Sequence, residues 1–328
     1  MSVPHRQEYS GWRWLMLACV AVSHVWTMTW LSWALVPMQF QNPALRVRGL
    51  AEALTWGCAA ALGVVLGGAA LAMVPGRMRR HQGEGAAIGG GCVNELWFVL
   101  AGVAGLAGGT AAAAMLGAAS ALLAAAAGVG IVFYRLAGRY FPALAVVGAG
   151  LWHAVVMALP DPALSFAWPV MLTVTQVMAL GAFARVYGFA RPGLTSRDGW
   201  VVALGWAFLA LLLAGGMTTR EVALLPITAT VDTGMGRWMW VMPAAALAAF
   251  LVVALNMIAR SDRRLAAERV TALGTWWLLI YNAAWLSGAG LWGAAAAVSG
   301  LLVIMAGLGV WILATDRGRR TRPGYRLS

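Results

Sequence analysis

The chain has 328 residues, of which 62% are hydrophobic and only 10% are charged, and its mean hydropathy is +0.78. This composition excludes a soluble protein, because too few polar residues remain to cover a soluble surface, and it predicts an integral membrane protein. All 23 basic residues are arginine, and against 11 acidic residues they give a formal net charge of +12. They lie in short loops between apolar runs, which favours contact with anionic lipid headgroups and excludes a nucleic-acid partner.

The apolar runs predict an all-α fold, a polytopic membrane helical bundle of about ten transmembrane helices. Each run is continuous and long enough to cross a bilayer, and a crossing segment must satisfy its backbone hydrogen bonds internally. The runs follow one another closely, so residues 1–328 are expected to form a single integral-membrane domain. The expected spans are 12–37, 51–74, 95–115, 117–134, 142–160, 164–187, 199–217, 237–259, 272–290 and 292–314.

Arginine alternates between the two sides of this bundle. The termini and the loops after every second span carry nineteen arginines, and the opposite connections carry four. Positive charge stays on the cytoplasmic side, so the pattern predicts a multi-pass protein of the cell inner membrane with both termini in the cytoplasm. The basic segment 315–328 would be a cytoplasmic tail, and the connection 217–236 would cap the outer mouth.

Two histidines, His24 and His153, lie well inside apolar runs, where a polar ring needs a partner. The simpler interpretation is a hydrogen bond to a neighbouring helix. The alternative is that the two rings face one another and ligate haem b.

The sequence predicts no metal site. Most acidic residues, such as Glu52 and Asp161, lie in loops or at helix ends, and no two carboxylates are four residues apart on a helix. The three cysteines are far apart in the sequence and form no metal-binding motif.

The cytoplasmic loops after the second, fourth and sixth spans hold the candidate headgroup site. If these loops converge, their guanidinium groups would bind a phosphate, diphosphate or carboxylate headgroup. The alternative is that the arginines only set the topology. The candidate residues are Arg77, Arg79, Arg80, Glu84, Tyr134, Arg135, Arg139, Tyr187, Arg191, Arg197 and Asp198.

The placement of these loops, the span lengths and the segment FYRLAGRYFPALAVVGAG (133–150) resemble the UbiA-type polyprenyl-transferase superfamily over about residues 12–290. The helix at 292–314 would be an addition. The resemblance implies a functional loop after the second and the sixth helix, and headgroup contacts by Tyr134, Arg135 and Arg139. The family's Asp-rich, Mg-binding motifs are absent, because the corresponding segments read MVPGRMRRHQGEG and VYGFARPGLTSRDG.

The expected function is therefore that of a membrane protein related to prenyltransferases that binds an isoprenoid, a quinone, a pigment or another lipid. It would act as an accessory subunit of a membrane complex, with membrane lipids around it. Mg-dependent prenyl transfer is not expected, since one acid per loop does not hold the ions that neutralise a diphosphate. Two alternatives remain open: a diverged, metal-independent prenyl transferase, and a haem- or quinone-handling anchor subunit of an oxidoreductase.

Overall fold

The computed structural model describes residues 9–36, 43–83, 91–137, 140–163, 166–187, 193–218 and 235–320. Within these ranges the side chains of some helix-end residues, including 72–83 and 134–137, are not described. The predictions about the connection 217–236, about Glu84, Arg139 and Arg191, and about the tail beyond residue 320 fall wholly or largely outside the described residues.

The described chain is an all-α bundle. Ten long helices correspond one to one with the ten expected apolar runs, and α2 is an additional short helix. The helices are α1 (Tyr9–Leu35), α2 (Pro43–Arg48), α3 (Leu50–Gly83), α4 (Gly91–Ala114), α5 (Ala118–Ala137), α6 (Pro142–Ala158), α7 (Ala167–Val186), α8 (Ser196–Thr218), α10 (Met235–Arg260), α11 (Arg263–Gly288) and α12 (Trp292–Arg320).

Six of the described helices, α1, α3, α4, α7, α8 and α10, are long and apolar enough to cross a membrane. Three others have shorter apolar stretches, at Ala118–Phe133, Pro142–Ala158 and Trp292–Leu308. Helix α11 is more polar: it begins with Arg263 and Arg264 and carries Asn282 in its second half. A polar helix of this kind is stable in lipid when other helices surround it, and α11 packs against α1, α7, α10 and α12.

Several expected boundaries were wrong in the same direction, because helices continue beyond the apolar runs. Helix α3 extends to Gly83 and α12 to Arg320, and α11 already begins at Arg263. Arginine, methionine and glutamine are good helix formers, so a helix does not end where its hydrophobic residues end. Arg77, Arg79 and Arg80, expected in a loop, are therefore on the last turns of α3.

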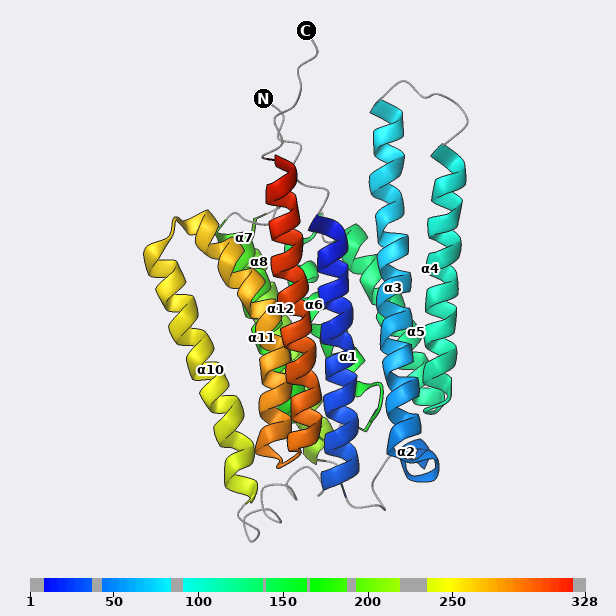
Figure 1. Cartoon of the computed structure of the whole chain (residues 1–328), viewed down its shortest axis with the longest axis vertical. Coiled ribbons are helices and arrows are strands. Elements are labelled where there is room, and N and C mark those ends of the chain that lie inside the picture. The colour runs from blue at the N-terminus through cyan, green and yellow to red at the C-terminus, as the bar shows by residue number, and fades with distance from the viewer. Residues whose placement is uncertain are drawn as a thin grey trace.

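The bundle has two halves that share α1 and α6. On one side, α3, α4 and α5 pack against one another and against α1 and α6. On the other side, α7 and α8 pack on α6, while α11 and α12 pack on α1. Figure 1 shows the α3–α4 pair at one edge and α10 at the opposite edge. Helices α1 and α6 contribute residues to both of the large apolar clusters, so a group between them lies at the centre of the bundle.

Glycines bring α3 and α4 into backbone contact. A Cβ atom added to Gly63 would lie 2.6 Å from Cα of Gly109, and one added to Gly67 would lie 2.5 Å from the backbone nitrogen of Leu106. In lipid the hydrophobic effect does not bring apolar helices together, because the lipid tails are equally apolar, so helices associate through such close packing. The small residues of this stretch are therefore structural.

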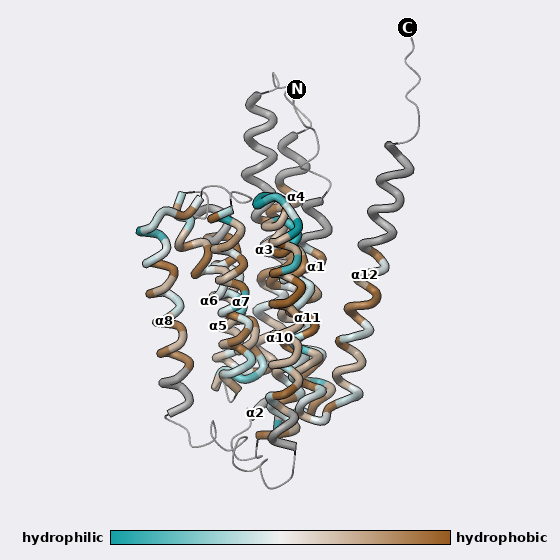
Figure 2. The backbone as a smooth tube through the Cα atoms, turned by 90° about the vertical axis from the view of Figure 1, so that its left-hand side faces the viewer, coloured by the Kyte–Doolittle hydropathy of each residue, from teal (hydrophilic) through white to brown (hydrophobic). Residues whose placement is uncertain are grey.

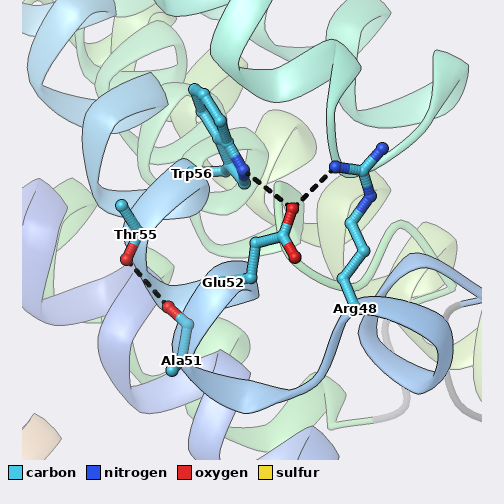
Figure 3. A network of polar contacts seen from close by, with 5 residues as sticks. All are labelled: Arg48, Ala51, Glu52, Thr55 and Trp56. Carbon is cyan, nitrogen blue, oxygen red and sulfur yellow. Dashed lines mark hydrogen bonds and ion pairs between the residues drawn. The ribbon is translucent and has the colours of Figure 1, made fainter.

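Hydrophilic residues gather at the ends of the helices. In Figure 2 the start of α8 and the turn between α10 and α11 are hydrophilic, whereas the middle of the outer helices is mostly hydrophobic. The first residues of α1 and the last described residues of α12 lie at this same end of the bundle (Figure 1). At the opposite end, Arg48 of α2 donates to Glu52 of α3 at 2.8 Å, and the indole of Trp56 donates to the same carboxylate oxygen at 3.3 Å (Figure 3).

Candidate functional site

Two histidines and an asparagine from three helices form a hydrogen-bonded chain inside the bundle. Nε2 of His24 on α1 lies 3.1 Å from Nδ1 of His153 on α6. On the other edge of the His24 ring, Nδ1 lies 3.0 Å from Nδ2 and 3.3 Å from Oδ1 of Asn282 on α11. The exposed fractions of His24, His153 and Asn282 are 0%, 6% and 1%. The two rings therefore do face one another, and each also connects its helix to a neighbour.

Ser23 anchors the asparagine end of this polar chain. Its hydroxyl donates to the backbone oxygen of Val20 at 2.8 Å and accepts from Nδ2 of Asn282 at 2.7 Å. One amide hydrogen of Asn282 is thereby committed to Ser23. The rest of the amide faces Nδ1 of His24 with both a donor and an acceptor.

The register of α1 and α6 positions the histidine pair. Ser32 donates to Asp161 at 2.9 Å, and these two residues are as far apart in the sequence as His24 and His153. The two helices are thus parallel, and the second contact lies eight residues further on, about 12 Å along α1 and just after the end of α6. Asp161 lies in the connection between α6 and α7, as expected, but it is only 1% exposed and also accepts from the backbone nitrogen of Ala163.

Trp152 adds a second polar group beside His153. Their ring centroids are 4.7 Å apart and their planes meet at 82°. The indole nitrogen of Trp152 is buried and finds no hydrogen-bond partner among the described residues. The same holds for the hydroxyls of Thr27 and Tyr281, which belong to the helices that carry His24 and Asn282. An unpaired buried donor costs about 1–3 kcal/mol, so each of these groups needs an explanation.

The surroundings of Trp152 are apolar and combine small side chains with larger ones such as Val64, Ile131 and Leu159. Trp152 belongs to a cluster with Ala60 and Ala61 of α3 and Ala124 and Ala127 of α5. This cluster fills the half of the bundle on the α3–α5 side. A ligand head at Trp152 would therefore have an apolar environment for its remaining atoms.

The histidine pair does not fit a haem iron in this arrangement. A bis-histidine haem has its iron between the two ring nitrogens, with the porphyrin separating the rings. Here the two nitrogens are hydrogen-bonded to each other at 3.1 Å and the rings meet edge to face at 83°. Among the described residues, no three His, Cys, Asp or Glu side chains gather around a point that a metal ion would occupy.

The predicted headgroup residues are only partly described. Arg77, Arg79 and Arg80 lie on α3, and Tyr134 and Arg135 on the last turn of α5, without described side chains. Tyr187 ends α7, where its ring lies 4.4 Å from that of Phe183. Whether these groups converge therefore stays a prediction, as does the metal-independent transferase that depends on them.

Two of the headgroup residues are at the start of α8. Arg197 is exposed to the exterior of the bundle. Asp198 forms a capping box with Thr195: its carboxylate accepts from the Thr195 backbone nitrogen at 2.8 Å and from the hydroxyl at 2.7 Å. The Thr195 hydroxyl in turn accepts from the Asp198 backbone nitrogen at 3.3 Å. Asp198 thus has a structural role in starting α8.

Sequence reasoning missed Asn282, Ser23 and Trp152. Asn282 is the polar residue of the run LLIYNAAWL, and a lone amide inside an apolar run is the signal that would have found it. Nothing in the sequence pairs it with His24, since the two are 258 residues apart.

No family model matches this chain, and neither a curated protein nor a solved structure shows a significant similarity to it.

Proposed function

We propose that the chain is a multi-pass protein of the inner membrane, with both termini in the cytoplasm, that binds an amphipathic ligand at the Trp152–His153 step of α6. The ligand class is an isoprenoid, quinone, pigment or related lipid with a head that accepts hydrogen bonds. The observation that carries the proposal is the unpaired indole N–H of Trp152 in ring contact with His153, at the end of a buried polar chain.

A head with a carbonyl oxygen suits this site for an energetic reason. It would satisfy the indole donor, whose burial without a partner costs about 1–3 kcal/mol. It would also reach Nε2 of His153, the ring nitrogen outside the contact with His24. Binding energy then comes from groups that are already buried and oriented, so little ordering cost is added.

The position between the two halves also favours a ligand site. Polar side chains inside a membrane bundle are costly and commonly mark substrate pathways. Sites between helices of a bundle are frequent, and here α1 and α6 join the α3–α5 side to the α7–α12 side. The arginine asymmetry supports the orientation, and the loop layout supports kinship with the UbiA-type superfamily without its metal-dependent chemistry.

The test is to extract the protein from native membranes in lipid nanodiscs and to identify co-purified small molecules by mass spectrometry. The unaltered protein should retain one amphipathic ligand at near-stoichiometric level, and the Trp152→Phe, His153→Gln double variant should lose most of it. Trp200→Phe, which alters an indole that is 73% exposed, is the matched control and should retain the ligand. An equal content in the double variant and the control, or only bulk lipid in all three, contradicts the proposal.

A further inference from the structure

The amide of Asn282 presents both a donor and an acceptor to one nitrogen of His24. Nδ2 lies 3.0 Å and Oδ1 lies 3.3 Å from Nδ1 of His24, while Nδ2 also donates to Ser23 at 2.7 Å. An amide nitrogen carries two hydrogens and an amide oxygen accepts, so Nδ1 of His24 has a partner in either tautomer. A small rotation of the amide is enough to exchange the two contacts.

Each tautomer of His24 sets the tautomer of His153. When Nδ1 of His24 accepts from the amide, its Nε2 carries the hydrogen and donates to Nδ1 of His153, so the hydrogen of His153 is on Nε2. When Nδ1 of His24 instead donates to Oδ1, every hydrogen bond reverses and Nε2 of His153 has a free lone pair. Going from the first state to the second releases a proton from Nε2 of His153 to water, moves the Nε2 hydrogen of His24 to Nδ1 of His153, and takes up a proton from water at Nδ1 of His24, so that each ring keeps one hydrogen. The two states differ in the positions of hydrogens and in a small rotation of the Asn282 amide, and both rings are neutral in each state.

We infer that the chain Asn282–His24–His153 is a reversible hydrogen-bond adaptor, which lets the site hold a ligand in a carbonyl form and in a hydroxyl form. The quinone and quinol pair is an amphipathic class that alternates between these two forms, and it is the class we assign to the site. This inference rests on the proposed function and specifies its ligand.

A fixed partner would not have this property. If Nε2 of His153 were a fixed donor beside the indole N–H, the hydrogen of a hydroxyl head would have no acceptor, and if it were a fixed acceptor, its lone pair would face the oxygen of a carbonyl head. Either mismatch weakens binding by about tenfold to a hundredfold. An adaptor that reverses removes this penalty for both forms. The indole of Trp152 serves both as well, because a carbonyl and a hydroxyl oxygen each accept a hydrogen bond.

The first experiment measures binding of decylubiquinone and of its quinol to the protein in nanodiscs, by quenching of tryptophan fluorescence. We expect dissociation constants within about tenfold of each other for the unaltered protein. Asn282→Asp keeps the size of the side chain, and its carboxylate form only accepts, so it holds the hydrogen on Nδ1 of His24 and leaves the lone pair on Nε2 of His153. This variant should favour the quinol by at least about tenfold more than the unaltered protein does.

Asn256→Asp is the matched control, because it places a carboxylate on an exposed position of α10. Its ratio of the two dissociation constants should equal that of the unaltered protein. An Asn282→Asp ratio that is unchanged, or shifted toward the quinone, overturns the adaptor.

The second experiment needs no ligand and no variant at Asn282. Nitrogen NMR of the protein labelled with ¹⁵N-histidine distinguishes a protonated from a bare ring nitrogen, and His153→Gln assigns the signals. The unaltered protein should show both tautomers of His153, and a single tautomer overturns the inference. If both tautomers are present and neither quinone form binds, the adaptor stands and the proposed ligand class fails.

Discussion

The backbone contact between α3 and α4 allows a sharp test with two neighbouring glycines. Gly109 of α4 faces α3, and an added Cβ would lie 2.8 Å from the backbone nitrogen of Val64 and 3.0 Å from the backbone oxygen of Ala60. Gly108 is the next residue on the same helix, and its added Cβ would meet nothing within 4 Å. Gly109→Ala should therefore destabilise the bundle, and Gly108→Ala should not.

The expected magnitude follows from what the two substitutions share. Each replaces a helical glycine by alanine, which by itself stabilises a helix by about 1 kcal/mol. This gain cancels when the two variants are compared. The remaining difference is the strain of forcing a methyl group against a backbone that cannot move aside by changing rotamer, about 1–3 kcal/mol. Gly108→Ala should be at least as stable as the unaltered protein.

The assay is thermal unfolding in a mild detergent. The readout is the fraction of protein that remains monodisperse in size-exclusion chromatography after heating. Both variants and the unaltered protein are heated in parallel, so that detergent effects are common to all three. Equal midpoints for Gly108→Ala and Gly109→Ala would refute the close approach of α3 and α4 and, with it, the structural interpretation of the small residues.

Two further outcomes are expected from the polar contacts. Asn282→Leu leaves Nδ1 of His24 without its amide partner in the interior and should lower the free energy of unfolding by about 1–3 kcal/mol. The control Asn256→Leu changes an exposed position of α10 and should alter this free energy little. Equal thermal midpoints for the two variants would contradict the buried hydrogen-bonded chain. Arg48→Ala removes the ion pair with Glu52, whose side chains are 33% and 44% exposed, so it should lower the free energy of unfolding by less than about 1 kcal/mol and by still less at high salt. A larger decrease that does not depend on salt would show that the pair is shielded from solvent.

Sequence alone was sufficient to predict the class of fold. Lipid cannot satisfy a bare backbone, so long apolar runs have to be helices, and ten such runs correspond to ten long helices of the described chain. The ends of these helices were less predictable. Arg77–Arg80 and Arg263–Arg269 continue or begin helices, because helix propensity extends beyond the residues that contact lipid.

The candidate site was only half accessible from the sequence. The two histidines were conspicuous because ionisable residues are rare inside apolar runs, and this is a local property. Their partners were not conspicuous. Asn282 contacts His24, and the indole of Trp152 is buried, only because particular helices lie side by side, and no short sequence pattern specifies which helices are neighbours.

The amino-acid sequence alone specifies the solvent of the chain, because the hydrophobicity of each residue adds to the apolar runs independently of its neighbours in space. Helical structure and burial in lipid follow from it directly. The meeting of α1, α6 and α11 is decided only by tertiary packing, including the parallel register that aligns His24 with His153 and Ser32 with Asp161. The physical reason is that a hydrogen bond between helices depends on the relative position of two rigid bodies, which no segment of the chain specifies alone.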